Sequence, residues 1–223
     1  MTQVYGHRGA SGNFPENTLE AFEAAIAMGV HGVELDVRRA ADDSVVVLHD
    51  AHLADGRAIV DLDRASLPDE VPDLAAVLDL CVDITVNVEI KVGRKDPDYD
   101  PDGAIVALTA DVCRQAGAID RVIITSFDRP SIDAMRTVLP EVRTGLISML
   151  PVDLGELAAE GHGGFMPFCG VVAEQLVTEA HDLGLFVGTW TANAPELITA
   201  VAAAGVDAVL TDYPDRALEL LGR

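Results

Sequence analysis

Lysine is almost absent from this sequence: of its 15 basic residues only Lys91 and Lys95 are lysines. Basic residues are outnumbered by 37 acidic ones, and the formal net charge is −22. A surface this acidic repels nucleic acids and anionic lipids, so we expect neither a nucleic-acid partner nor a stable association with membranes. It also repels anionic substrates, so a site for a phosphate ester needs its own local positive charge.

Aromatic residues and cysteines are also scarce. With aromatics at 4% of the chain, the core must be built from Ala, Val, Leu and Ile, which suits a buried parallel sheet flanked by helices. The three cysteines, Cys81, Cys113 and Cys169, have no metal-ligand or CxxC spacing and are expected to be reduced thiols. No apolar run reaches about 18 residues and no signal peptide is evident, so we expect a cytoplasmic protein.

Short β-branched segments alternate with Ala- and Leu-rich segments along the whole chain. We predict strands at Val4–His7, Gly32–Val37, Thr85–Lys91, Val122–Ser126, Arg143–Leu146, Gly170–Val172, Phe186–Trp190 and Ala208–Thr211. We predict helices at Thr18–Met28, Leu74–Leu80, Gly103–Ala116, Arg129–Val138, Asp153–Ala159, Glu174–Leu183, Pro195–Ala203 and Asp215–Leu221. Eight β/α repeats in a chain of this length favour an α/β fold of the TIM (β/α)8 barrel type, formed by residues 1–223 as one domain.

The first predicted helix has clear boundary signals. Asn17 is the expected N-cap, Glu20 follows three residues later, and Gly29 comes after the last turn. No glycine-rich GxGxxG segment follows a strand, which argues against an open nucleotide-binding sheet.

The run Val45–His49 does not fit the eightfold count. The turn signal at 42–44 predicts that this run folds back as a short antiparallel hairpin excursion after the second strand. In that register His49 lies opposite Glu34 or Leu35, so the hairpin brings a second histidine to the barrel mouth.

Charged residues alternate with apolar ones in the segments VELDV and VNVEIKV. Glu34 and Asp36 share one strand face, as do Glu89 and Lys91, and in a barrel covered by helices that face points inward. Two carboxylates about 4 Å apart repel each other by about 1–4 kcal/mol. The cluster therefore predicts a compensating divalent cation, and oxygen ligands favour Mg²⁺ or Ca²⁺ over Zn²⁺. An internal ion-pair cluster that includes Arg8 is the structural alternative.

His7 ends the first predicted strand and lies next to Arg8. Two histidines at one mouth can divide general-base and general-acid work near neutral pH. Zinc ligation by His7 and His49 is an alternative that the carboxylate-rich surroundings disfavour. The Arg8 guanidinium suits a bidentate phosphate contact, and Lys91 can hold the same group as a point charge.

Seven segments of the chain resemble, in order, the glycerophosphodiester phosphodiesterase family. They are HRGASGNFPENTLEAF, GVELDV, VVVLHD, VEIK, ITSFD at 124–128, GTWTAN at 188–193 and VDAVLTDYP at 206–214. The resemblance spans nearly the whole chain, so it is far more specific than any single motif. It implies a TIM barrel that hydrolyses glycerophosphodiesters to an alcohol and glycerol 3-phosphate.

The resemblance also implies a role for each matched residue. It implies His7 and His49 as the acid/base pair, Glu34, Asp36 and Glu89 as ligands of one divalent cation, Mg²⁺ or Ca²⁺, Arg8 and Lys91 as the phosphate-binding pair, and Phe127 and Trp190 as walls for the glycerol or head group. The family favours attack by the glycerol 2-hydroxyl through a cyclic phosphate over attack by water. Which histidine is the acid, and the oligomeric state, stay open.

Two departures from the family pattern leave the preferred head group open. The HD motif is followed by AHLADGRAIVD where the family often has an arginine-threonine segment, and Ala173-Glu174 follows the sixth predicted strand where a stronger substrate contact is expected. A lysophospholipase D-type activity on the same site is the second enzyme hypothesis. A barrel that binds phosphodiesters without hydrolysing them is the third.

Overall fold

The alternation of apolar and charged residues along β2 (Gly32–Arg39) determines which way its side chains point. Val33, Leu35 and Val37 pack into a core of 44 buried residues shared with the surrounding helices. Glu34 and Asp36 point the other way, into the barrel, and are also buried. The inward direction of these carboxylates was predicted from the sequence.

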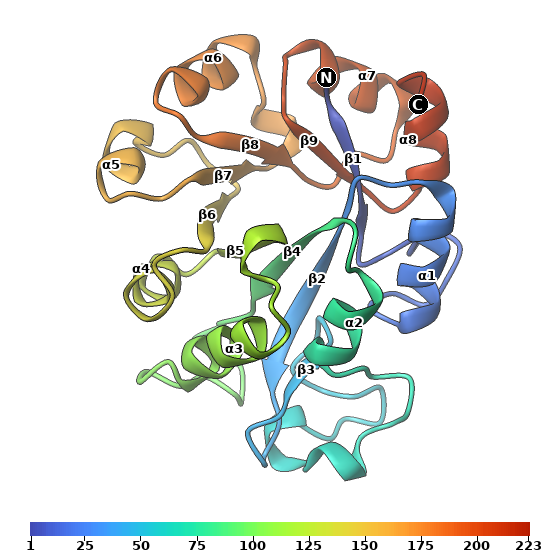
Figure 1. The fold of residues 1–223 in the computed structure, drawn as a ribbon, viewed down its shortest axis with the longest axis vertical. Helices are drawn as coiled ribbons and strands as arrows, with labels where there is room; N and C mark the ends of the chain where they lie inside the picture. Colours follow the sequence, from blue (N-terminus) through green and yellow to red (C-terminus); the bar gives the residue numbers. More distant parts are fainter.

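The computed structural model describes residues 1–223, and in it eight parallel strands form a closed ring with helices between them (Figure 1). Besides β2, the strands of the ring are β1 (Gln3–His7), β4 (Thr85–Ile90), β5 (Val122–Ser126), β6 (Arg143–Ser148), β7 (Gly164–Pro167), β8 (Phe186–Thr189) and β9 (Ala208–Thr211). Because β1 pairs with both β2 and β9, the first and last strands close the ring. The predicted (β/α)8 barrel is confirmed.

Eight α-helices surround the barrel. They are α1 (Leu19–Met28), α2 (Leu74–Leu80), α3 (Ala104–Gln115), α4 (Arg129–Val138), α5 (Leu154–Ala159), α6 (Glu174–Asp182), α7 (Pro195–Ala203) and α8 (Pro214–Leu220). Each overlaps one of the predicted helices. All three cysteines are free and buried, as predicted. None of the helices combines the length and the apolar character that crossing a membrane requires.

The predicted hairpin excursion is also confirmed. β3 (Val45–Val47) pairs antiparallel with the end of β2, in a register that sets Val37 opposite Val47, and it lies outside the ring. Residues 48–73 then form an irregular lobe, and a small cluster of five buried apolar residues joins it to the preceding segment: Ala40, Val46, Ile59, Leu67 and Val71. Figure 1 shows this excursion, residues 40–73, below the barrel next to α2.

The predicted strand at Gly170–Val172 is wrong. The sixth ring strand is Gly164–Pro167, and Cys169–Val171 forms one turn of 3-10 helix. The observed strand GFMP contains no β-branched residue, whereas Val171 and Val172 attracted the prediction. Here the place in the ring, with hydrogen-bonded strands on both sides, overrides local preference.

The predicted cap of the first helix is wrong by one residue. Thr18 is the N-cap, and its hydroxyl accepts from the Ala21 N–H at 3.2 Å. Asn17 adopts a left-handed conformation with φ of 58°. Its buried side-chain amide instead donates to Asp36 Oδ2 at 2.9 Å. Asn17 therefore belongs to the interior of the barrel mouth.

Candidate active site

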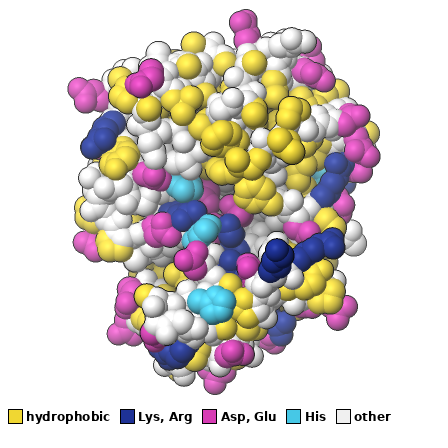
Figure 2. All heavy atoms as spheres, turned by 180° about the vertical axis from the view of Figure 1, so that it is seen from behind, with side chains coloured by type: hydrophobic (Ala, Val, Ile, Leu, Met, Phe, Trp, Pro, Cys, Tyr) yellow, Lys and Arg dark blue, Asp and Glu magenta, His cyan; other side chains and the backbone are white.

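A cavity of about 220 Å³ opens at the carboxyl ends of the barrel strands. Eight of the nine site residues predicted from the sequence line it, namely His7, Arg8, Glu34, His49, Glu89, Lys91, Phe127 and Trp190. The ninth, Asp36, is fully buried and forms ion pairs with Arg8 and Lys91. Figure 2 shows the hollow, where histidine, acidic and basic side chains gather next to a broad group of hydrophobic ones.

Three carboxylates from neighbouring strands meet at this cavity. Glu34 and Asp36 lie on β2 and Glu89 on β4, and the strand register sets Asp36 opposite Glu89. One oxygen of each lies within 4.8 Å of the others. Lys91 Nζ is 2.8 Å from Glu89 Oε1 and 3.5 Å from Asp36 Oδ1. Arg8 Nε is 3.1 Å from Asp36 Oδ2. Three carboxylates thus face two cations.

The charges of this cluster are not fully balanced. Burial and repulsion by Asp36 raise the pKa of Glu34 to about 8, and the same causes raise the pKa of Glu89. Burial also disfavours ionisation of Asp36, but Lys91 and Arg8 outweigh it and hold the pKa of that carboxyl below its usual value. Asp36 Oδ1 is buried and accepts no hydrogen bond. An oxygen-rich, under-compensated cluster with a free acceptor fits a hard divalent cation.

A tight turn after β1 brings Arg8 to the carboxylates. Arg8 and Gly9 both have positive φ, 54° and 83°. A Cβ on Gly9 would lie 2.6 Å from the Ala21 carbonyl carbon, so only glycine fits there. The turn directs the Arg8 N–H to Glu34 Oε2 at 3.0 Å. The guanidinium Nη1 donates to both oxygens of Glu16 at 2.9 Å.

The two histidines reach the cavity from different segments. His7 Nδ1 lies 2.6 Å from Asp212 Oδ1, and its Nε2 lies 3.8 Å from Glu34 Oε2. Burial disfavours protonation of His7, but Glu34 and the hydrogen bond to Asp212 raise its pKa above the usual value. His49 follows β3 and has Nδ1 2.7 Å from Asp50 Oδ1.

Aromatic side chains form the opposite wall of the cavity. The rings of Phe127 and Trp190 meet edge to face with centroids 5.3 Å apart. The Trp190 indole N–H donates to the Met166 carbonyl at 2.9 Å, which fixes its orientation. A larger space of about 930 Å³ adjoins this cavity, shares Lys91 and Phe127 with it, and extends along the excursion. The site therefore has a small inner part and a wide outer part.

Four residues near the histidines were not assigned a role from the sequence. Asp212 contacts the His7 ring, Ser11 donates to the His7 carbonyl, and Asn193 donates to Asp212. Arg38 Nε donates to the His49 carbonyl at 2.8 Å. Closure of the barrel could have predicted the role of Asp212. In a closed barrel the last strand lies next to the first, so Asp212 after β9 lies next to His7.

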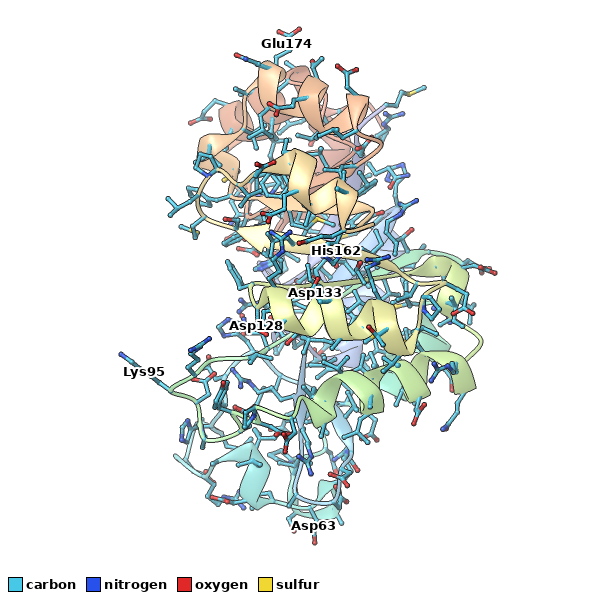
Figure 3. All side chains as sticks on the ribbon, turned by 90° about the vertical axis from the view of Figure 1, so that its left-hand side faces the viewer. Asp63, Lys95, Asp128, Asp133, His162 and Glu174 are labelled. Carbon is cyan, nitrogen blue, oxygen red and sulfur yellow. The ribbon has the colours of Figure 1, made fainter.

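A second group of possible metal ligands is formed by Asp133 on α4, Glu160 after α5 and His162 before β7. Figure 3 shows Asp133 and His162 next to each other. Both ring nitrogens of His162 already have partners, Thr144 at 2.8 Å and Asp133 at 2.9 Å. Glu160 is paired with Arg129. These groups satisfy one another, as expected for a packing histidine.

The barrel and the charged cavity at its carboxyl end define the class of the protein, a phosphoric diester hydrolase. The chain belongs to the glycerophosphoryl diester phosphodiesterase family, which matches residues 7–216. The predicted resemblance is confirmed, and the reaction class is hydrolysis of glycerophosphodiesters.

Individual relatives agree with this assignment. A glycerophosphodiester phosphodiesterase of Caldanaerobacter subterraneus is 29% identical over 248 residues, with 99% of this chain and 98% of that protein covered. A crystal structure from Silicibacter pomeroyi, of a protein assigned as a glycerophosphoryl diester phosphodiesterase, has 31% identity and a TM-score of 0.91, and 99% of this chain and 93% of that chain are covered. An Oleispira antarctica phosphodiesterase, solved in complex with its product sn-glycerol-3-phosphate, has 24% identity and a TM-score of 0.89, with 100% and 98% covered, and shows the same fold.

Proposed function

We propose that this protein cleaves glycerophosphodiesters to an alcohol and glycerol 3-phosphate in a reaction that depends on a divalent cation and on two histidines. The observation that carries the proposal is the meeting of His7 and His49, from separate segments, at one cavity that also contains Glu34 and Glu89. Residues 1–223 supply the whole site, so we propose that they act as one domain.

Glu34, Asp36 and Glu89 would hold the cation, Mg²⁺ or Ca²⁺. Their oxygens lie within 4.8 Å of one another, and the Asp36 Oδ1 atom has no hydrogen-bond partner. When bound, such a cation supplies charge stabilisation to a phosphoryl oxygen. Arg8 and Lys91 are the cationic side chains that line the inner cavity, and they would bind the remaining phosphoryl charge.

The two histidines would move the protons. A phosphodiester needs one proton removed from the attacking hydroxyl and one added to the leaving alkoxide. Each ring has its Nδ1 next to a carboxylate, Asp212 for His7 and Asp50 for His49. A carboxylate can only accept, so the proton stays on Nδ1 and the Nε2 atom is left for proton exchange with the substrate.

Phe127 and Trp190 would form the wall against which the glycerol or head group packs. Phe127 is 45% exposed and lines both the inner cavity and the outer space. An aromatic face at this point excludes water from one side of the phosphate and leaves the outer space for the alcohol.

A coupled assay for glycerol 3-phosphate tests the proposal. Glycerophosphocholine and glycerophosphoethanolamine are offered with Mg²⁺, with Ca²⁺ and after chelation. We expect release with an added ion, loss on chelation, and no turnover by Glu34→Gln or Glu89→Gln. The matched control is Glu160→Gln in the outer cluster, which should retain activity. Full activity after chelation would contradict the metal requirement, and no release from any glycerophosphodiester would favour a barrel that only binds them.

We further propose that the glycerol 2-hydroxyl is the nucleophile, so that a cyclic glycerol phosphate precedes the product. Trapping this intermediate would support the route. Quantitative incorporation of ¹⁸O from water without a cyclic intermediate would contradict it.

A lysophospholipid is the second candidate substrate. Phe127, Met149 and Leu150 are exposed after the carboxyl ends of β5 and β6, where an acyl chain leaving the cavity would pass. The net charge of −22 disfavours approach to anionic membranes. Turnover of lysophosphatidylcholine above that of glycerophosphocholine would make the lipid the preferred substrate.

A further inference from the structure

A chain of hydrogen bonds leads away from the cavity behind His7. His7 Nδ1 lies 2.6 Å from Asp212 Oδ1. The Ser11 hydroxyl donates to the His7 carbonyl at 2.7 Å and lies 3.2 Å from Asp212 Oδ1. The other carboxylate oxygen, Asp212 Oδ2, accepts from Asn193 Nδ2 at 2.6 Å. Both carboxylate oxygens are therefore occupied, and Asp212 holds a single orientation toward the ring.

The orientation of Asn193 in this chain is determined by its neighbours. Its Oδ1 accepts from the Asp212 backbone N–H at 2.9 Å and from the Thr211 hydroxyl at 3.0 Å. A backbone N–H can only donate, so the atom facing it must be the amide oxygen. The Asn193 NH₂ group then necessarily faces the Asp212 carboxylate.

We propose that Asp212, oriented by Asn193, is a positioning residue that fixes one tautomer of the neutral His7 ring and directs its Nε2 atom into the cavity. The inference deepens the proposed function, on which it rests. The Asp212 carboxylate has no proton to donate, so His7 carries its proton on Nδ1. The Nε2 atom, 3.8 Å from Glu34 Oε2, is then the free acceptor on the substrate side.

The Asp212→Asn variant has a predictable effect on this tautomer. Because Asn193 presents its NH₂ group to the side chain at this position, the new amide turns its oxygen toward Asn193. Its own NH₂ group then faces His7 Nδ1 and donates to it. The His7 proton moves to Nε2, the wrong nitrogen for accepting a proton from the substrate.

The chain offers a matched control at the other end of β9. Asp207 precedes β9 and Asp212 follows it, and Asp207 pairs with His181 Nε2 at 2.9 Å at the opposite end of the barrel. Asp207→Asn changes the same group in a histidine–aspartate pair that has no contact with the cavity.

Steady-state kinetics on glycerophosphocholine test the proposal. We expect Asp212→Asn to lower kcat by about 10²-fold or more while KM changes by less than about threefold, since an aspartate that orients a catalytic histidine acts on the chemical step. Asp207→Asn should stay within about twofold of the wild type in kcat. Asn193→Ala, which keeps the carboxylate but frees it to rotate, should lower kcat by about 10-fold, and it reports on the chain if Asp212→Asn fails to fold.

A second readout does not depend on turnover. The ¹⁵N shifts of the His7 ring, assigned by their loss in His7→Gln, report which nitrogen carries the proton. We expect protonated Nδ1 in the wild type and protonated Nε2 in Asp212→Asn. An unchanged tautomer, or kcat within about threefold of the wild type, would overturn the proposal. A wild type with the expected tautomer but no turnover would instead refute the proposed function.

Discussion

His7 ends a barrel strand that is hydrogen-bonded on both sides, whereas His49 follows a three-residue strand outside the ring. The difference extends to how each ring is held. Asp212, 28% exposed, holds the His7 ring, but the partner of the His49 ring is Asp50, which is 79% exposed. His49 is instead held through its backbone, whose carbonyl accepts from Arg38.

The two halves of the proposed acid/base pair are therefore held differently, His7 rigidly and His49 adjustably. On the barrel side, the precision lies in the side chain. On the excursion side, the backbone of His49 is held in place, whereas its imidazole contacts the exposed Asp50. The excursion also lines the wide outer space, so His49 is the histidine next to the space proposed for the leaving alcohol.

Removing each histidine side chain in turn should produce the largest effect on kcat. We expect His7→Ala and His49→Ala to lower kcat by about 10²–10⁴-fold each, because each removes a proton-transfer group. Added imidazole should restore more activity to His49→Ala, since the His49 side chain is 34% exposed and that of His7 16%. The measurement is kcat with and without imidazole, and equal restoration would remove the distinction between the two halves.

Replacing the buried Arg38, which contacts both the His49 carbonyl and Asp98, should produce the next largest effect, a loss of stability. Arg38 is 4% exposed and lies 2.7 Å from Asp98, which is 6% exposed. Arg38→Met leaves that buried carboxylate unpaired, and we expect a loss of about 3–5 kcal/mol in the free energy of unfolding. Arg39→Met is the matched control, because Arg39 is 31% exposed and pairs with Asp43, 56% exposed. It should cost about 0–1 kcal/mol in urea denaturation. Similar losses for the two variants would mean that the buried Arg38–Asp98 pair contributes no more than the exposed Arg39–Asp43 pair.

The dependence of stability on pH tests the role of Glu34 on the barrel side. Its pKa is raised from 4.5 to about 8, so the folded protein binds this proton more tightly than the unfolded chain. The stability contributed by this proton is fully present below the pKa of Glu34 in the unfolded chain. It is lost as pH rises through the pKa of Glu34 in the folded protein. We expect Glu34→Gln to raise the Tm of the metal-free protein by roughly 2–8 °C at pH 9 and little at pH 4.5.

Divalent cations supply the control for this effect. Mg²⁺ or Ca²⁺ should raise the Tm of the wild type at high pH and that of Glu34→Gln much less, as ligand linkage requires. An equal Tm for both proteins at every pH, measured by differential scanning calorimetry, would show that Glu34 carries no such strain.

The smallest effect is expected at Asp50. Because this carboxylate is 79% exposed, its ion pair with His49 is worth little, and Asp50→Asn should lower kcat by only about two- to fivefold. The comparison with Asp212→Asn is direct, since both changes alter the carboxylate next to a histidine Nδ1. A loss at Asp50 as large as that at Asp212 would mean that the two halves are equally rigid.

Much of this architecture could be predicted from the sequence. Local patterns predict every ring strand except Gly164–Pro167, and they also predict the antiparallel run at 45–47. Apolar periodicity and turn residues act over only a few residues, so they can be read from the sequence. The convergence of Glu34 and Glu89 followed from strand alternation together with the rule that barrel sites form at the carboxyl ends of strands.

The parts that were missed depend on contacts between distant segments. The strand Gly164–Pro167 is formed by its neighbours rather than by its own residues. Asparagine is typical of an N-cap, yet the side-chain amide of Asn17 donates to Asp36, 19 residues away. Asp212 and His7 are separated by 205 positions, so no local pattern links them.

The closure of the ring by its first and last strands gives the site an order of assembly during synthesis. Glu34, Asp36 and Glu89 lie on strands that are adjacent as soon as β4 has left the ribosome. The Asp212 partner of His7 is made more than a hundred residues later. A growing chain would therefore contain the proposed ligands for a cation well before it could orient its first histidine, and the proposed proton transfer would wait for the final strand to dock.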